Sequence, residues 1–269
     1  MNTTDNLNTN WRKVASAIYR KPTDSRIFGS VEIDITDLEA FIAEKRRNGI
    51  KITLTHFFTI AVARGIKEAV PELNTFMRRG KVILHSQVDA MVSVLLKDQQ
   101  LGSVKVHDAD RLTLNGLFTV MNDAIAQTKV GDENKIMQKK NIIAVLPWPL
   151  RQWAFRFYKM ISINWGFSMP LLNLSANQFG SFVLTNIGSL GLDMGIPALL
   201  PTANVSLVFV LGGAVKKPVV VNDQIVIRKI LALGATIDHR IADASHGAKL
   251  FRYLKNVVRN PQLLDQPPV

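Results

Sequence analysis

Apolar and polar residues alternate in several stretches of the chain, a pattern typical of half-buried strands. In the first such stretch, residues 26–35, Val31, Ile33 and Ile35 share one face. Similar patterns, rich in β-branched and aromatic residues, predict strands at 76–84, 89–96, 101–106, 180–185, 205–211 and 224–237. We expect residues 76–84 to form a hairpin that turns at Arg79-Gly80 and the polar residues 97–100 to close a second hairpin.

Helical spacing occupies much of the remaining sequence. Apolar positions three and four residues apart predict helices at 11–20, 38–48, 55–70, 112–128 and 243–258. Asp37 is expected to cap the second of these helices, Gly49 to end it, and Pro71 to end the third. Helices interleaved with hairpins and longer strands, without regular βαβ alternation, predict an α/β fold, a two-layer sandwich with a mixed β-sheet. We expect one domain over residues 1–269.

Composition narrows the chemistry available to the chain. Hydrophobic residues make up 47% and charged residues 20%, which is enough apolar material for a folded core. With no cysteine there is no disulfide, thiolate metal ligand or cysteine nucleophile, so any reacting thiol must belong to a substrate. The polar start, residues 1–10, does not resemble a secretory signal, and proline and glycine interrupt the long uncharged stretches. We therefore expect no membrane span and a cytoplasmic protein.

The chain is strongly basic, and the charge is unevenly distributed. Its net charge of +12 would attract nucleic acid, anionic lipid or a phosphate-rich small molecule. Residues 135–192 contain no acidic residue and six basic ones. The sequence contains no recognition-helix, zinc-finger or RNP pattern, so nucleic acid is not expected as a partner.

The densest cluster of reactive side chains lies where the last predicted strand meets the last helix. Asp238, His239, Arg240 and Asp243 stand there together, and a histidine near carboxylates can act as a general base. His246 follows Asp243 by three residues and would share its helix face, which leaves a metal hydrolase using His239, Asp243 and His246 as an alternative. A plainer interpretation is a group of solvated charges at a helix start, where aspartate is favoured.

These residues resemble a family signature. Asp238-His239-Arg240-x-x-Asp243, followed by Gly247-Ala248, resembles the DHRxxDG and GAxF motifs of the catalytic domain of 2-oxo acid dehydrogenase dihydrolipoyl acyltransferases. Residues 180–191, GSFVLTNIGSLG, are similar to that family's GTFTITNIGSLGG run, and residues 12–15 and 260–264 resemble its first helix and its terminus. The resemblance covers nearly the whole chain and extends to chloramphenicol acetyltransferase. It implies a chloramphenicol acetyltransferase-like fold and CoA-dependent acyl transfer.

The resemblance also implies a role for each matching residue. His239 would be the base that takes the proton from an attacking thiol, hydroxyl or amine, and Thr185 would donate a hydrogen bond to the tetrahedral oxyanion. Asp243 would be a structural carboxylate paired with Arg12. No metal and no covalently bound cofactor is expected, because the CoA thioester is a substrate; the acceptor is unidentified. The residues expected to bind substrate are Asn186, Arg12 and Arg240.

The chain departs from the family pattern, and the departures bear on its assembly. Ala244 replaces the glycine that follows the motif aspartate. Only ten residues precede Trp11, so we expect a stand-alone catalytic domain without lipoyl or subunit-binding domains. In the family, the base and the oxyanion donor come from neighbouring subunits of a trimer. Because Pro267 and Pro268 cannot continue a helix, we expect a homotrimer that builds no larger shell.

Residues 139–177 form a basic, aromatic-rich insert in place of a short polar connection. Helical spacing predicts a basic stripe of Gln152, Arg156, Lys159 and Ile163, opposite an apolar side of Trp153, Phe157, Met160 and Ile161. Three interpretations remain open: a peripheral membrane element at the inner membrane surface, a cover over an apolar acyl pocket, or an ordinary helix on the core. A non-catalytic trimeric scaffold or membrane-surface protein that retains the fold is the alternative to an enzyme.

Overall fold

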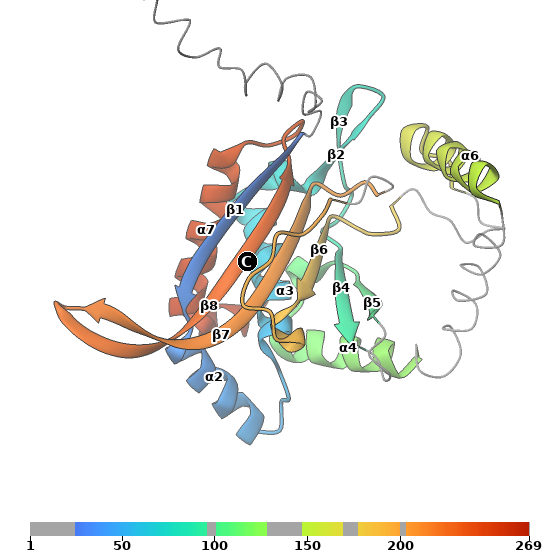
Figure 1. The fold of residues 1–269 in the computed structure, drawn as a ribbon. Helices are drawn as coiled ribbons and strands as arrows, with labels where there is room; N and C mark the ends of the chain where they lie inside the picture. The colour runs from blue at the N-terminus through green and yellow to red at the C-terminus, as the bar shows by residue number, and fades with distance from the viewer. Residues whose placement is uncertain (1–24, 96–100, 128–146, 169–176, 200–202, 269) are drawn as a thin grey trace, which may run out of the picture.

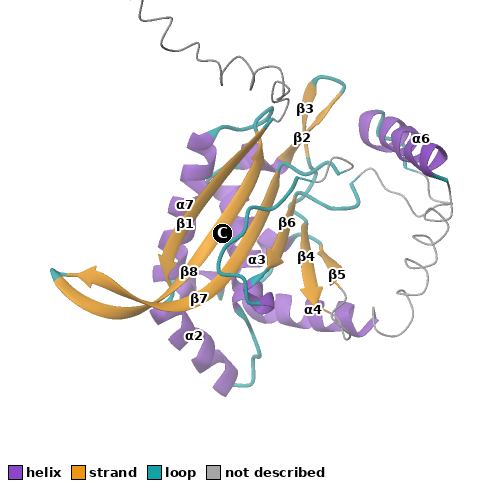
Figure 2. Cartoon of the chain, in the orientation of Figure 1, coloured by secondary structure: helices purple, strands orange, loops and turns teal. Residues whose placement is uncertain are grey.

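The structure, a computed structural model, describes residues 25–95, 101–127, 147–168, 177–199 and 203–268. The strands are β1 (Arg26–Asp34), β2 (Thr75–Arg78), β3 (Lys81–Leu84), β4 (Ala90–Leu95), β5 (Leu101–Val106), β6 (Phe182–Asn186), β7 (Leu207–Val221) and β8 (Gln224–Asp238). The helices are α2 (Thr36–Arg47), α3 (Leu54–Glu68), α4 (Leu114–Gln127), α6 (Trp148–Tyr158) and α7 (Ala244–Arg259). A π-helical segment, Lys159–Asn164, continues α6. Figure 2 shows how these helices and strands are distributed.

Six strands form one mixed sheet in the order β1-β8-β7-β6-β4-β5, and β2 and β3 form a separate hairpin. Helices α2, α3, α4 and α7 lie together on one face of the sheet, and α6 stands apart from them (Figure 1). This arrangement confirms the predicted α/β sandwich. The predicted helix at 11–20 lies outside the described residues.

The core forms around α3, which is buried along most of its length. Its sequence, LTHFFTIAVARGIKE, is apolar on nearly every side, as is typical of a helix enclosed by other elements. Phe57 and Phe58 are completely buried. Arg64 is also buried, and its guanidinium donates to the backbone carbonyls of Asp110, Leu112, Leu263 and Gln266. These hydrogen bonds tie the residues after α7 to the middle of the domain.

Strand direction determines where the polar strand ends lie. β6 runs parallel to β4 and to β7, whereas β7 and β8 are antiparallel. The carboxyl ends of β6 and β8 therefore lie at opposite edges of the sheet.

The structure corrects two of the predicted boundaries. β7 continues to Val221 rather than ending at residue 211, and it pairs with β8 up to Val221 opposite Gln224. Proline has no backbone N–H to donate, yet Pro218 is tolerated in β7. β6 pairs with β7 only as far as Leu211, so no strand on that side needs a donor at Pro218. Asp37 does not cap α2. Instead, the side chain of Asp34 accepts hydrogen bonds from the backbone nitrogen and the hydroxyl of Thr36, the first residue of the helix.

Two glycines allow an irregular segment to lie directly on the sheet. A β-carbon on Gly212 would collide with the carbonyl oxygen of Asp193, and one on Gly234 with that of Gly195. Thr236 then donates to the carbonyl of Pro197, which fixes the same segment further along β8. Residues 192–197 thereby cover the sheet between the ends of β6 and β8.

Candidate functional site

His239 begins the turn between β8 and α7, where its backbone nitrogen donates to Ser25 O at 2.7 Å. Its side chain is exposed, and its Nδ1 lies 3.0 Å from the carbonyl oxygen of Ala242. A carbonyl oxygen can only accept, so Nδ1 carries the proton in the neutral ring. Nε2 is then the nitrogen that can take up a proton, as a general base requires.

Asp238 and Arg240 form an ion pair on either side of this histidine. Arg240 Nη2 lies 2.5 Å from Asp238 Oδ2 and its Nε 2.9 Å from Asp238 Oδ1, while the Asp238 side chain is buried. Hydrogen bonding to the carboxylate raises the pKa of Arg240 above its ordinary value. The sequence predicted that Arg240 binds substrate. In the structure its guanidinium pairs with Asp238, and this ion pair helps to hold the turn that carries His239.

Asp243 is the N-cap of α7. Its Oδ1 accepts from the backbone nitrogen of Ser245 at 2.9 Å and from the Ser245 hydroxyl at 2.6 Å. His246 Nδ1 lies 2.9 Å from the same oxygen and 3.1 Å from the backbone nitrogen of Asp243, which closes a capping box. Hydrogen bonds from Ser245 and His246 hold the pKa of this carboxyl well below its ordinary value. The expected partner, Arg12, lies outside the described residues.

The three side chains of the metal-hydrolase alternative do not form one group in the described residues. His246 contacts Asp243, whereas His239 is turned towards Ala242. Within the described ranges, no three histidine, aspartate or glutamate side chains gather closely enough to hold a metal ion. Ala244, the departure from the family motif, is exposed at the first position of α7.

Thr185 and Asn186 stand at the carboxyl end of β6, beside a cavity of about 280 Å³. Asn186 Nδ2 donates to Thr55 Oγ1 at 3.1 Å, and Asn186 Oδ1 accepts from the backbone nitrogen of Ser189 at 3.2 Å. Asn186 therefore orders the turn after β6 and joins it to the start of α3. Polar side chains in the wall of this cavity include Thr53, Thr55, His56, Ser93, Thr185, Asn186 and Ser189.

His56 in this wall was not anticipated from the sequence. Its Nδ1 lies 2.7 Å from Thr53 Oγ1, and Thr53 also caps α3. Its Nε2 is buried and has no hydrogen-bond partner among the described residues. Burial, with a smaller effect from Arg46, lowers the pKa of His56 to about 4, so the ring is neutral at pH 7. The only signal in the sequence was a histidine near the start of an otherwise apolar helix.

One chain does not bring Thr185 and His239 together. Thr185 is opposite Val210, which is opposite Gly234 on β8. His239 follows Gly234 by five residues, which is roughly 17 Å along an extended strand. The two side chains therefore lie at opposite edges of the sheet.

A second cavity, of about 490 Å³, lies beside the turn that carries His239. Asp238, Arg240 and Ile241 line one side of it. Lys159 and Asn164 line it from the π-helical segment of the insert. The insert thus forms part of a cavity wall next to the candidate base.

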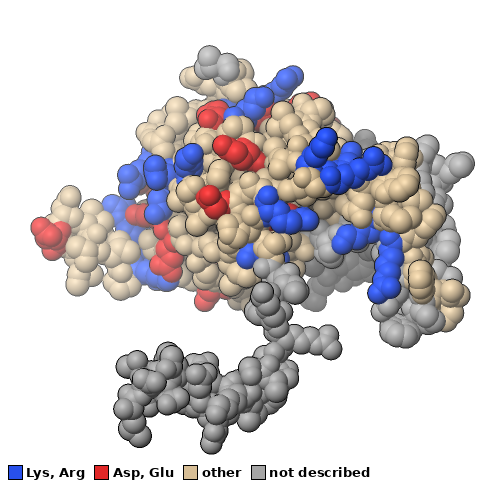
Figure 3. Space-filling view, turned by 90° about the horizontal axis from the view of Figure 1, so that it is seen from above, with Lys and Arg blue, Asp and Glu red and all other residues tan. Residues whose placement is uncertain are grey.

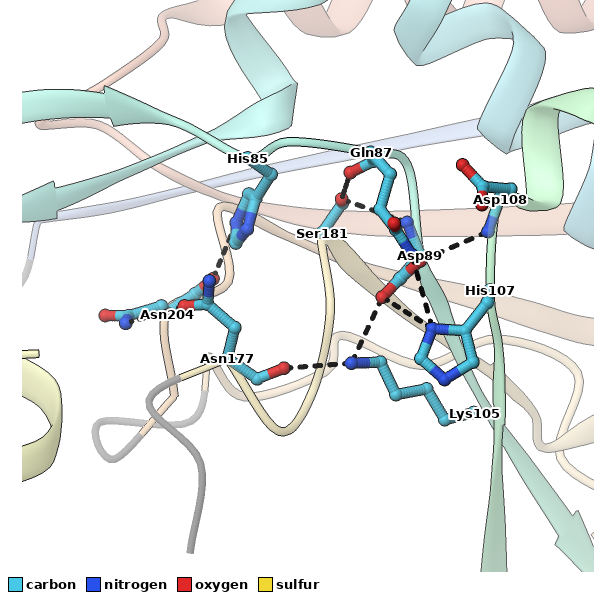
Figure 4. A network of polar contacts seen from close by, with 9 residues as sticks. All are labelled: His85, Gln87, Asp89, Lys105, His107, Asp108, Asn177, Ser181 and Asn204. Atoms are coloured by element: carbon cyan, nitrogen blue, oxygen red, sulfur yellow. Dashed lines mark hydrogen bonds and ion pairs between the residues drawn. The ribbon is translucent and has the colours of Figure 1, made fainter. Parts of the chain in front are cut away.

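A network of polar contacts centred on Asp89 positions β6 (Figure 4). Asp89 accepts from Gln87 and from the backbone nitrogen of Asp108, and it pairs with Lys105 and His107. Burial opposes ionisation of Asp89, but the hydrogen bonds from Gln87, Lys105 and Asp108 outweigh it and lower the pKa of Asp89.

The network also explains the first glycine of the GSFVLTN run. Ser181 donates to Gln87 O through its hydroxyl and to Asp89 O through its backbone nitrogen. Gly180 has φ +73°, and a β-carbon there would lie 2.7 Å from the backbone oxygen of Asp89. Glycine is therefore required where the chain enters β6, the strand that carries Thr185.

The described part of the insert, residues 147–168, corrects the predicted distribution of its side chains. Arg156 lies over the ring of Trp153, so basic and aromatic groups share one side of α6 rather than facing opposite ways. Ile163, placed in the basic stripe, is buried because the π-helical segment docks there. Trp153 and Phe157 are exposed, so α6 does not present them to the core.

Known proteins resemble this chain over most of its length. Residues 171–265 match the family model for the 2-oxoacid dehydrogenases acyltransferase (catalytic domain). The dihydrolipoyllysine-residue acetyltransferase component of the acetoin cleaving system of Bacillus subtilis (strain 168) is 23% identical over 263 residues, which are 95% of this chain and 55% of that protein. The chain spans about half the length of the curated relatives it matches.

Solved structures show the same fold. The cubic core of the pyruvate dehydrogenase multienzyme complex has a TM-score of 0.65 at 18% identity, covering 90% of this chain and 84% of that chain. The dihydrolipoamide acetyltransferase of Azotobacter vinelandii, in which the catalytic role of a serine, a histidine and an asparagine has been investigated, has a TM-score of 0.63 at 19% identity with the same coverage. The predicted resemblance and fold are therefore confirmed: residues 171–265 match the family model for the catalytic domain of the 2-oxoacid dehydrogenases acyltransferases, and the chain has the fold of their catalytic cores.

Proposed function

We propose that this chain is a CoA-dependent acyltransferase that moves an acyl group between a CoA thioester and a thiol, hydroxyl or amine acceptor. We base this on His239, whose Nδ1 faces the Ala242 carbonyl and whose Nε2 is thereby left to accept a proton. The family match over residues 171–265 includes both His239 and Thr185 and supports the assignment.

In the proposed reaction, His239 takes the proton of the acceptor as the nucleophile attacks the thioester carbonyl. Thr185 donates a hydrogen bond to the oxyanion of the tetrahedral intermediate. Collapse of that intermediate breaks the carbon–sulfur bond, and the proton on His239 passes to the CoA thiolate. No acyl-enzyme forms. Asp243 supports the base indirectly by capping α7 and ordering the turn between His239 and the helix.

The relative from Azotobacter vinelandii supports these roles. The histidine and asparagine investigated in that enzyme are four positions apart, as His239 and Asp243 are here. Thr185 supplies a hydroxyl, as a serine does. Aspartate in place of asparagine retains the oxygen that accepts from Ser245 in this chain.

We further propose that the active site is completed between two copies of the chain in a homotrimer. The separation of Thr185 and His239 within one chain supports this, because a base and an oxyanion donor must reach the same carbonyl. The core structure of the pyruvate dehydrogenase complex, which is a cubic assembly, shares the fold and supports self-association.

Loss of the proposed base tests the function. We expect His239→Ala to lower acyl transfer by at least about a hundredfold, the low end for removal of a general base. Thr185→Ala should lower it somewhat less. The measurement is turnover with a panel of acyl-CoAs and acceptor thiols, alcohols and amines.

Thr119→Ala is the matched control, because Thr119 is an exposed threonine of α4 whose hydroxyl donates within its own helix. Circular dichroism should show that all three variants are folded. Wild-type turnover in both site variants would contradict the assignment. Absence of any acyl transfer by the wild-type protein would favour the scaffold alternative.

A further inference from the structure

Helix α6 and the residues after it expose a group of large apolar side chains, which we call the aromatic surface. Trp153 is 66% exposed and Phe157 58%. Positions three and four apart lie on one side of a helix, so the members in α6 share a face. Exposed apolar side chains that lie together on one face mark sites of association. The aromatic surface consists of Leu150, Trp153, Phe157, Met160, Trp165 and Phe167.

Basic side chains lie against the aromatic surface and within it. The Arg156 guanidinium lies 6.0 Å from the ring centre of Trp153, and the Arg79 guanidinium 5.3 Å from that of Trp165. Lys159 is exposed next to Met160. The sequence has no acidic residue from 135 to 192. In the view of Figure 3, the side of the molecule that carries α6 shows Lys and Arg but no Asp or Glu.

The aromatic surface is attached to the body of the domain at a defined place. Ser162 and Ile163 are buried in the π-helical segment. Gly166 has φ +82° and lies against Arg78, where a β-carbon would collide with the guanidinium. The turn of the hairpin β2–β3 meets the aromatic surface, because Arg79 lies over the ring of Trp165.

We propose that the aromatic surface binds the interfacial region of an anionic lipid bilayer, so that the protein associates peripherally with the inner surface of a membrane. Tryptophan and phenylalanine side chains on one side of a short helix suit the headgroup boundary. Arginine and lysine among them suit anionic headgroups rather than neutral ones. None of the described helices has the length and apolar character to cross a bilayer.

Sedimentation with lipid vesicles tests this without any substrate. The full chain is mixed with vesicles of phosphatidylcholine alone or with phosphatidylglycerol added, at low and high salt. We expect pelleting with the anionic vesicles, weakened by salt because the charges are exposed. Replacing Arg156 and Lys159 by Gln should weaken anionic binding by about fivefold for each charge removed. Trp153→Ser with Phe157→Ser should abolish binding to the anionic vesicles.

Matched variants elsewhere on the surface are the controls. Lys249→Gln with Lys255→Gln removes two exposed charges of α7, and Val220→Ser with Ile225→Ser removes two exposed apolar groups near the turn between β7 and β8. Both controls should bind as the wild type does. Wild-type protein that stays in the supernatant overturns the proposal. Binding that the Trp153 and Phe157 replacements leave unaffected also overturns it. Self-association of the free protein that only those replacements remove overturns it as well. None of these outcomes depends on acyl transfer.

Discussion

At the scale of single residues, environment gives chemically identical groups different properties. His239 is exposed at the end of β8, with Nδ1 held by a backbone carbonyl. His56 and His85 are buried, and burial lowers the pKa of each to about 4. His85 Nε2 lies 3.1 Å from Asn204 O, whereas His56 Nε2 has no partner in the part of the chain that the structure describes. The exposed histidine is the candidate base, and the buried pair makes stability depend on pH.

The pKa of His56 predicts a loss of stability in mild acid. The unfolded chain takes up a proton near pH 6.5, whereas the folded chain resists protonation until about pH 4. The stability associated with the neutral ring is therefore present above pH 6.5 and is lost as the pH falls towards 4, by about 3 kcal/mol at most. Urea unfolding at several pH values between 7.5 and 4.5 measures how steeply the free energy of unfolding changes with pH.

His56→Leu removes this titration. The slope of the unfolding free energy against pH should decrease by an amount that corresponds to at most one bound proton. Above pH 7 the free energies of unfolding of the variant and the wild type should differ only by a constant. A variant with the wild-type slope between pH 6.5 and 4.5 would show that His56 is not the group responsible.

At the scale of elements, the sheet and the segment 192–197 fit together because β7 and β8 contain glycines at the contact. The carbonyl oxygens of Asp193 and Gly195 occupy the space that side chains would need at Gly212 and Gly234. The pairing of β7 with β8 also shifts register between Leu211 and Ala214, next to the first of these contacts. The glycines are thus required by a long-range contact rather than by a local turn.

We expect Gly234→Ala to destabilise the domain by about 1–3 kcal/mol, because the new β-carbon would displace the backbone of residues 192–197. Gly116→Ala in α4 is the control: its β-carbon would meet Thr113 Oγ1 at an acceptable 3.4 Å, and alanine favours helix. Thermal unfolding should show a lower midpoint for Gly234→Ala and an unchanged or higher one for Gly116→Ala. Equal midpoints for Gly234→Ala and wild type would contradict the close contact.

At the scale of the whole molecule, strand direction separates the two halves of the candidate site. β6 delivers Thr185 to one edge of the sheet, and β8 delivers His239 to the other. The proposed site between two subunits would bring the two groups to the same substrate. We expect a trimer of roughly 90 kDa, three times the 29.9 kDa chain, closed by cyclic symmetry.

Mixing inactive variants tests the shared site. His239→Ala and Thr185→Ala subunits, dissociated mildly and reassociated in equal amounts, should recover about a quarter of the wild-type activity, because one interface in four keeps both groups. Each variant treated alone is the control and should keep only its own low activity. A fully active monomer by light scattering would refute the shared site, and a 24-subunit particle would refute the limit to a trimer.

The sequence by itself determined most of the elements and the position of the candidate base. Periodicity located β1, α3 and both hairpins, because these elements follow from alternation, helical spacing and turn residues that act locally. The motif around His239 identified the turn after the last strand. Tertiary structure decided what depends on distant contacts: the burial of His56 and the Asp89 network that orders β6. It also decided the exposure of Trp153 and Phe157. Helical spacing establishes that side chains share a face, but neighbouring elements determine whether that face is covered.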